Sequence, residues 1–114
     1  MGDLSAHFSV SEFVDRRTGH RYGPDPELVA VLERIRALRP GPLVVVSGHR
    51  CCSSNVTVGG APQSRHIAGD AADIPPERAT PSEAFECGAV GVGERDGWAV
   101  HVDTRPGPRA RWEY

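Results

Sequence analysis

Residues 64–73 read SRHIAGDAAD and join two polar side chains to the start of a β-strand. Residues 71–74 (AADI) predict a short strand, which the two prolines after it end because proline donates no backbone hydrogen bond. Gly69 interrupts the segment before this strand, so we expect a loop that turns into the strand rather than a continuous helix. His66 and Asp73 stand at the two ends of that turn, seven residues apart.

A second strand carries polar residues on one face. The pair Asp96-Gly97 is typical of a hairpin turn, and residues 98–103 (WAVHVD) then alternate between apolar and other side chains. This alternation predicts a half-buried strand. We expect its tryptophan and two valines to pack inward, while the other face carries His101 and Asp103, about 7 Å apart.

Two imidazoles and a carboxylate are the ligands of a candidate metal site. His66, Asp73 and His101 would supply three protein ligands and leave an open position for water, as catalytic zinc sites do. These ligand types suit zinc, which lowers the pKa of a bound water. The spacing also allows separate structural roles, with His66 at the surface, Asp73 as a cap and His101 hydrogen-bonded within its strand.

Three helices are predicted from start signals and periodicity. Asp25 precedes a proline and a glutamate, and apolar residues then recur at helical spacing, which predicts a helix that ends before Pro40. Capping-box patterns, a Ser or Thr followed three residues later by Glu, predict short helices at residues 10–15 and about 81–87. Gly88 fits the C-terminal cap of the last of them.

The remaining pattern predicts an α+β fold. Residues 43–46 (LVVV) form a continuous β-branched run, which predicts a buried strand. Residues 105–114 read as irregular, with Trp112 as a candidate clamp on the core. We therefore expect one domain over residues 1–114, built from a small antiparallel sheet with flanking helices.

The composition restricts the partners. The 114 residues are 39% hydrophobic and 6% aromatic, with 13 glycines and 10 prolines, so we expect a loop-rich domain that gains stability from a metal or a disulfide. The formal net charge of −2 gives no basic field for nucleic acid or membranes. The first 13 residues lack the pattern of a secretory leader. We expect a monomer that is cytoplasmic or released by lysis, or a mature form whose leader was removed.

The cysteines leave three alternatives open. Cys51, Cys52 and Cys87 are an odd number, which argues against a complete disulfide framework. One of the adjacent pair could form a disulfide with Cys87, all three could be free, or one could bind metal.

Residues 47–74 resemble a known family signature. The stretch SGHRCCSSNVTVGGAPQSRHIAGDAADI is similar to that of the zinc D-Ala-D-Ala carboxypeptidase family, which includes phage L-Ala-D-Glu endolysins and has the hedgehog/DD-peptidase fold. Residues 91–105 are similar to its closing segment with a His-x-Asp strand. Residues 7–13 (HFSVSEF) are typical of its small phage-type members. The resemblance therefore implies a hedgehog/DD-peptidase-like fold.

The resemblance also implies roles for individual residues. It makes His66, Asp73 and His101 zinc ligands. Arg50 matches the arginine that holds a substrate carboxylate or carbonyl, for which a planar guanidinium is suited; a surface ion pair is the alternative. Ser64 could hydrogen-bond substrate or the metal loop, or cap a turn.

The sequence departs from the family at the general base. Well-studied members carry Glu or Asp three residues before the last histidine ligand, whereas this chain has Trp98. Asp103 is the first substitute, either as the base or as a carboxylate that orients the imidazole of His101. Glu94 and Asp96 are weaker candidates, because acids near a turn are usually solvated.

Three functions are compatible with these observations. The first is a zinc metallopeptidase that cleaves peptidoglycan stem peptides at the cell wall, as a D,D-carboxypeptidase or endopeptidase. The second is a degenerate member that keeps zinc and binds cell-wall peptides without turnover. The third is a metal-dependent enzyme of other chemistry on the same fold.

Overall fold

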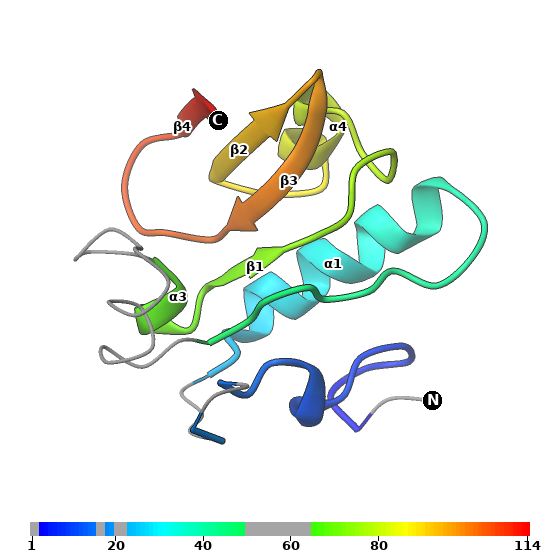
Figure 1. The fold of residues 1–114 in the computed structure, drawn as a ribbon, viewed down its shortest axis with the longest axis vertical. Helices are drawn as coiled ribbons and strands as arrows, with labels where there is room; N and C mark the ends of the chain where they lie inside the picture. Colours follow the sequence, from blue (N-terminus) through cyan, green and yellow to red (C-terminus); the bar gives the residue numbers. More distant parts are fainter. Residues whose placement is uncertain (1–2, 16–17, 20–22, 50–64) are drawn as a thin grey trace.

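The computed structural model describes residues 3–15, 18–19, 23–49 and 65–114. Its elements follow one another along the chain as Figure 1 shows. In order they are η1 (Val10–Glu12), α1 (Pro26–Leu38), α3 (Arg65–Ala68), β1 (Ala71–Asp73), α4 (Pro81–Glu86), β2 (Gly91–Arg95), β3 (Trp98–Asp103) and β4 (Ala110–Glu113).

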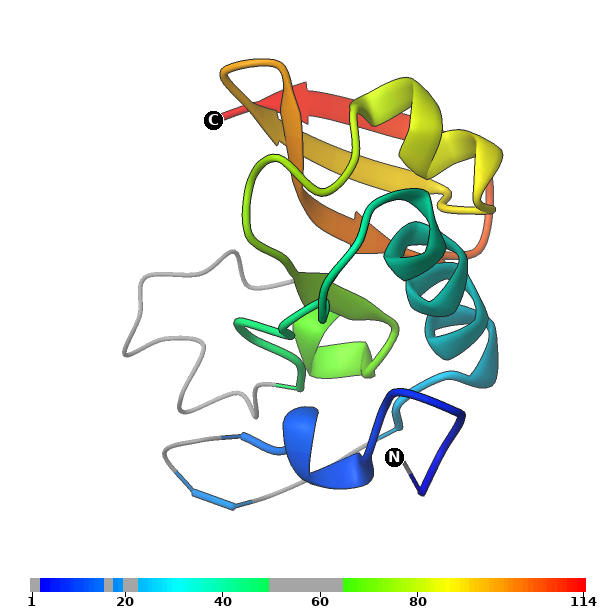
Figure 2. The same ribbon diagram turned by 90° about the vertical axis from the view of Figure 1, so that its right-hand side faces the viewer.

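The four strands form one mixed sheet in the order β1-β3-β2-β4. β3 pairs antiparallel with β1 and with β2, and β4 pairs parallel with β2. Helices α1 and α4 lie on one side of this sheet (Figure 2), which confirms the predicted α+β class. The expectation of an irregular segment at 105–114 was wrong for residues 110–113, which form β4 and, by pairing parallel with β2, make the sheet mixed rather than antiparallel throughout.

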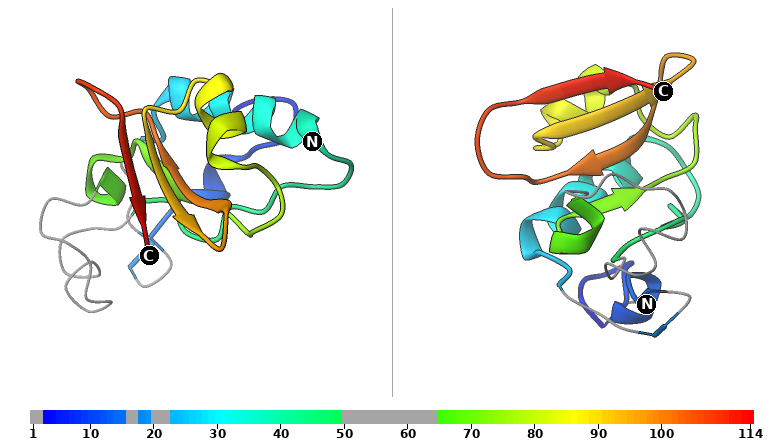
Figure 3. Two further views of the ribbon diagram at one scale, coloured as in Figure 1. Left: turned by 90° about the horizontal axis from the view of Figure 1, so that it is seen from above. Right: turned by 60° about the vertical axis from the view of Figure 1, so that its left-hand side comes forward.

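The core lies between the two helices and the sheet. Helix α1 buries one stripe of its surface, as predicted, and Asp25 caps its first turn by accepting a hydrogen bond from the Glu27 amide at 3.1 Å. The core side chains with no exposed surface include Phe8, Leu28, Leu32, Ile35, Val92 and Val102. The side of the sheet that faces α1 and α4 therefore carries the core, and Figure 3 shows both helices on that side.

Both capping boxes are present in the structure. In α4, Thr80 Oγ1 accepts from the Glu83 amide at 3.2 Å, and the Thr80 amide donates to Glu83 Oε1 at 2.8 Å. The first box is followed by one 3-10 turn rather than a helix over 10–15. The chain leaves that turn at Phe13, because the Phe13 carbonyl accepts from the His49 amide at 2.8 Å instead of continuing a helix.

Residues 43–46 do not form the buried strand that their composition predicts. The first and third of these side chains are buried, but the second and fourth are 55% and 51% exposed. The segment runs along the outer edge of β1, where Ser47 and Asp73 form a single bridge. A β-branched run is compatible with either location, and here the position at the edge leaves its outer face to solvent.

The alternation along β3 is shifted by a bulge. Gly93 pairs with His101 and Glu94 with Ala99, so Val100 has no partner on β2. After this irregularity Ala99, rather than the predicted Trp98, joins Val102 in the core. Trp98 and Val100 are only partly buried.

The structure also bears on the cysteines and on membrane crossing. The thiol of Cys87 is free and buried, and its candidate partners Cys51 and Cys52 lie outside the described residues. None of the helices in the described part of the chain has the length and apolar character that a membrane crossing requires.

Candidate metal centre

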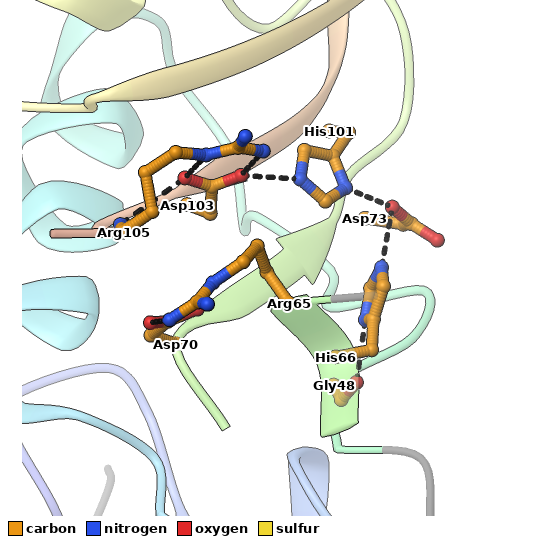
Figure 4. Close-up of polar contacts among 8 residues, drawn as sticks. All are labelled: Gly48, Arg65, His66, Asp70, Asp73, His101, Asp103 and Arg105. Atoms are coloured by element: carbon orange, nitrogen blue, oxygen red, sulfur yellow. Dashed lines mark hydrogen bonds and ion pairs between the residues drawn. The ribbon is translucent and has the colours of Figure 1, made fainter. Parts of the chain in front are cut away.

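Three segments bring His66, Asp73 and His101 together beside β1 and β3. His66 lies on the single turn of α3, where the sequence predicted a loop; Asp73 ends β1, and His101 is its cross-strand partner on β3. One ligand atom from each side chain lies within 4.8 Å of the other two. The structure thus groups the three residues that the sequence analysis singled out (Figure 4).

One carboxylate oxygen lies between the two imidazoles. Oδ1 of Asp73 is 3.1 Å from Nε2 of His66 and 3.1 Å from Nδ1 of His101. Both histidine side chains are almost fully buried, whereas that of Asp73 is 31% exposed. The group therefore opens to solvent on the side of Asp73.

The outer nitrogen of each imidazole has an acceptor of its own. Nδ1 of His66 donates to the Gly48 carbonyl at 2.6 Å, and Nε2 of His101 donates to Oδ2 of Asp103 at 2.8 Å. Neither acceptor carries a proton, so these two nitrogens are the protonated ones in a neutral imidazole. His66 Nε2 and His101 Nδ1 are the nitrogens that remain for a metal, and each lies within hydrogen-bonding distance of Oδ1 of Asp73.

Asp103 is held tightly behind His101. Its side chain has no exposed surface, and the Arg105 guanidinium donates to both of its oxygens, from Nε at 2.8 Å and from Nη2 at 2.7 Å. Gly91 lies opposite Asp103 on β2, and a Cβ atom at this position would collide with both carboxylate oxygens. The missing side chain at Gly91 therefore makes room for this carboxylate.

A second ion pair anchors the segment that carries His66. Arg65 donates through Nε to Oδ1 of Asp70 at 3.0 Å and also pairs with the other carboxylate oxygen. The Asp70 carbonyl accepts from the Thr104 amide at 2.9 Å. The turn between α3 and β1 is thereby attached to the end of β3, which keeps His66 beside His101.

Hydrogen bonds within the centre shift the pKa values of Asp73, Asp103 and His101. Burial raises the pKa of Asp73, but hydrogen bonds from His101 and His66 outweigh this effect and hold it well below its usual range. Burial likewise raises the pKa of Asp103, and hydrogen bonds from Arg105 and His101 lower it overall. Burial lowers the pKa of His101, but its bonds to the two carboxylates raise it above the ordinary value.

These shifts predict the pH dependence of the metal-free protein. The raised pKa of His101 adds stability that is complete below the unfolded value of about 6.5 and is lost as the pH rises through the folded value. The lowered pKa values of the two aspartates add stability that is complete above about 4 and is lost as the pH falls through their folded values. The chelated protein should therefore melt at a higher temperature at about pH 6 than at about pH 9. Thermal unfolding of the parent and His101→Gln proteins checks this; an equal pH dependence in both would contradict it.

The other predicted site residues are placed differently. Arg50 and Ser64 lie outside the described residues. Trp98 lies against Arg39, with the guanidinium carbon 5.4 Å from the indole centroid. Glu94, the weaker base candidate, accepts from Arg111 at 2.8 Å.

The geometry of Asp103 favours the orienting role over the base role. A base must reach the reacting atoms, whereas both oxygens of this buried carboxylate are already bound to neighbouring side chains. Asp96, the remaining candidate, is an exposed residue of the turn between β2 and β3.

Sequence reasoning missed Arg105 and the role of Trp112. The indole of Trp112 packs on the imidazole of His101, with ring centroids 5.1 Å apart. A signal for Arg105 was present, because an arginine two residues after Asp103 can fold back onto it. No local pattern indicates that Trp112 reaches the centre, since this depends on the pairing of β4 with β2.

Comparison with known families agrees with this geometry. The model of the family Peptidase M15 matches residues 6–103. The chain belongs to this family. Members of the peptidase M15 family are metal-dependent hydrolases, and the matched range includes the three grouped residues and Asp103. Among curated proteins, none matches the chain.

Proposed function

We propose that this member of the peptidase M15 family is a zinc-dependent peptidase that cleaves stem peptides of peptidoglycan. The reaction would be of the D,D-carboxypeptidase or endopeptidase type, at the cell wall. The supporting observation is the convergence of His66, Asp73 and His101, in which both outer imidazole nitrogens already donate to fixed acceptors.

The residues present fit a zinc ion. His66 and His101 offer neutral imidazole nitrogens and Asp73 a carboxylate oxygen, which is a ligand set that zinc enzymes use. When bound, zinc would polarise a scissile carbonyl and lower the pKa of a water molecule. The exposed side of Asp73 supplies the opening through which a peptide could approach.

The protein supplies orientation and substrate binding. In this proposal Asp103 holds the tautomer of His101, and the Gly48 carbonyl does the same for His66. Arg50 would pair with a carboxylate or carbonyl of the peptide and Ser64 would hydrogen-bond it, as the family resemblance implies. The segment 50–64 contains no Asp, Glu or His, so it adds no carboxylate or imidazole that could accept a proton.

A second candidate function follows from the same observations. Trp98 stands at the family's base position and Asp103 is fully buried, which would suit a module that binds wall peptides without cleaving them. Both candidate functions imply peptidoglycan as the partner.

Mass spectrometry of digested muropeptides separates the two functions. The zinc-loaded protein would be incubated with peptidoglycan and with soluble pentapeptide muropeptides. Release of D-Ala or opening of cross-links, absent with the Asp73→Ala control, would support the peptidase. Binding to peptidoglycan without new products would support the second candidate. If the protein neither binds peptidoglycan nor releases products, both candidate functions are excluded.

Removal of the metal is expected to destabilise the fold. A ligand that binds only the folded state adds roughly 2.7 kcal/mol at a hundred times its dissociation constant, and the ion would connect α3, β1 and β3. Chelation should therefore lower the melting temperature by several degrees, measured by scanning calorimetry. An unchanged melt of protein shown to have lost its metal would refute this structural role.

A further inference from the structure

Four side chains beside the metal centre form a closed ring of contacts. Nε2 of His101 donates to Asp103, and the guanidinium of Arg105 donates to both oxygens of that carboxylate. The guanidinium carbon of Arg105 lies 5.1 Å from the indole centroid of Trp112. The centroid of the indole in turn lies 5.1 Å from the centroid of the His101 imidazole, and the two ring planes make an angle of 54°. Each member touches the next, and the ring closes on the imidazole.

The sheet register explains how Trp112 reaches this position. Asp73, His101, Gly93 and Trp112 are successive cross-strand partners, so they form one row across all four strands. Gly93 has no side chain, and a Cβ atom there would lie 2.7 Å from Nε1 of the indole. The indole of Trp112 therefore lies over Gly93 of β2 and contacts the imidazole of His101 on β3.

We propose that Arg105 and Trp112 are positioning residues of the metal centre. The hydrogen bond to Asp103 holds one atom of the imidazole, but the ring could still swing about that point. The indole packs against the imidazole and restricts this motion, so that Nδ1 stays directed at Asp73. Arg105 contacts both Asp103 and Trp112, and so it keeps these two supports of the imidazole in place. Both residues lie beyond residues 6–103, the range that the family model matches.

This inference rests on the proposed zinc site but not on hydrolysis. Its first readout is zinc affinity, measured by competition with a chromophoric chelator. Its second is the visible absorption spectrum of the cobalt-substituted protein, which responds to the arrangement of the ligands. Neither quantity requires that the protein cleave a peptide.

Substitutions of Trp112 should separate the ring contact from general packing. Trp112→Leu is expected to weaken zinc binding about tenfold, the lower end of what supporting residues of metal ligands contribute, and to change the cobalt spectrum. Trp112→Phe keeps an aromatic face and should retain most of the affinity. Gly93→Ala would press on the indole and on the equally close ring of Tyr114, and it should weaken zinc binding without changing the tryptophan itself.

Substitutions of Arg105 test the other support. Arg105→Ala removes both hydrogen bonds to Asp103 and should also weaken zinc binding about tenfold. Arg105→Lys keeps the charge but loses the two-pronged contact with Asp103 and the guanidinium that lies over the Trp112 ring. It is therefore expected to restore the affinity only in part.

Trp98→Leu is the matched control. It removes the other tryptophan, which also lies against an arginine, Arg39, with no described contact to His101. This variant should lower the melting temperature while zinc affinity stays within about twofold of the parent value and the cobalt spectrum is unchanged.

The outcomes are decisive. If Trp112→Leu and Arg105→Ala both keep the parental zinc affinity and cobalt spectrum, the positioning role is wrong, whatever their stability. A parent protein that binds no divalent metal would overturn this inference together with the metal centre. Variant effects as expected, with no cleavage of any stem peptide, would support the inference and refute the proposed peptidase function.

Discussion

Replacement of His66 by alanine is expected to abolish stoichiometric zinc binding and all detectable cleavage of stem peptides. The centre offers three candidate protein ligands, and this change leaves only Asp73 and His101. Loss of an outer partner of a ligand costs about 10–100-fold in affinity or activity, so loss of a ligand should exceed the upper limit of that range. Metal content after dialysis and muropeptide digestion measure the two effects.

His7→Ala is the matched control for this prediction. His7 is another histidine bonded to a carboxylate, with Nδ1 2.7 Å from Oε1 of Glu33, but its side chain is 43% exposed and lies outside the grouped residues. Its removal should leave zinc content unchanged. A His66→Ala protein that keeps zinc at parental affinity would show that the ion is bound elsewhere.

Asp103→Ala is expected to weaken zinc binding by about 10–100-fold, because it removes the acceptor that holds the tautomer of His101. A general base would show another result, in which the turnover number falls while zinc affinity stays at the parental value. Asp103→Asn has one acceptor oxygen instead of two, so it should keep part of the contacts and give an intermediate affinity.

A second substitution tests the same role without changing the acid. Gly91→Ala would place a Cβ atom against both oxygens of Asp103 and should displace that carboxylate from His101. Glu86→Gln removes an exposed acid of α4 and should alter neither zinc affinity nor turnover. If Gly91→Ala and Asp103→Ala both bind zinc as the parent does, the orienting role of Asp103 is refuted.

Much of the local structure could be predicted because its signals act within a few residues. The cap at Asp25, the capping box of α4 and the turn at 96–97 each depend on hydrogen bonds or backbone angles of near neighbours. Residue chemistry together with the family resemblance also singled out His66, Asp73 and His101 as a group. Two imidazoles and a carboxylate at the positions of the family's ligands have few functions in common other than metal binding.

The errors came from contacts between distant segments. The continuous apolar run at 43–46 could not reveal that it lies at the edge of the sheet, with half of its side chains in solvent. The alternation along 98–103 could not reveal the bulge at Val100, which places Ala99 in the core. The number of covered faces and the register of a strand depend on its neighbours, not on its own sequence.

The sequence by itself therefore determined α1, α4, the turn at 96–97 and the residue types of the candidate ligands, while the tertiary structure decided what surrounds these residues. Asp103 could be read as a base or an orienting group until its burial beneath Gly91 and its contacts with Arg105 were seen. Trp112 meets His101 only because β4 pairs parallel with β2 across Gly93. Such a pairing is selected by the free energy of the whole packed sheet, which no local segment specifies.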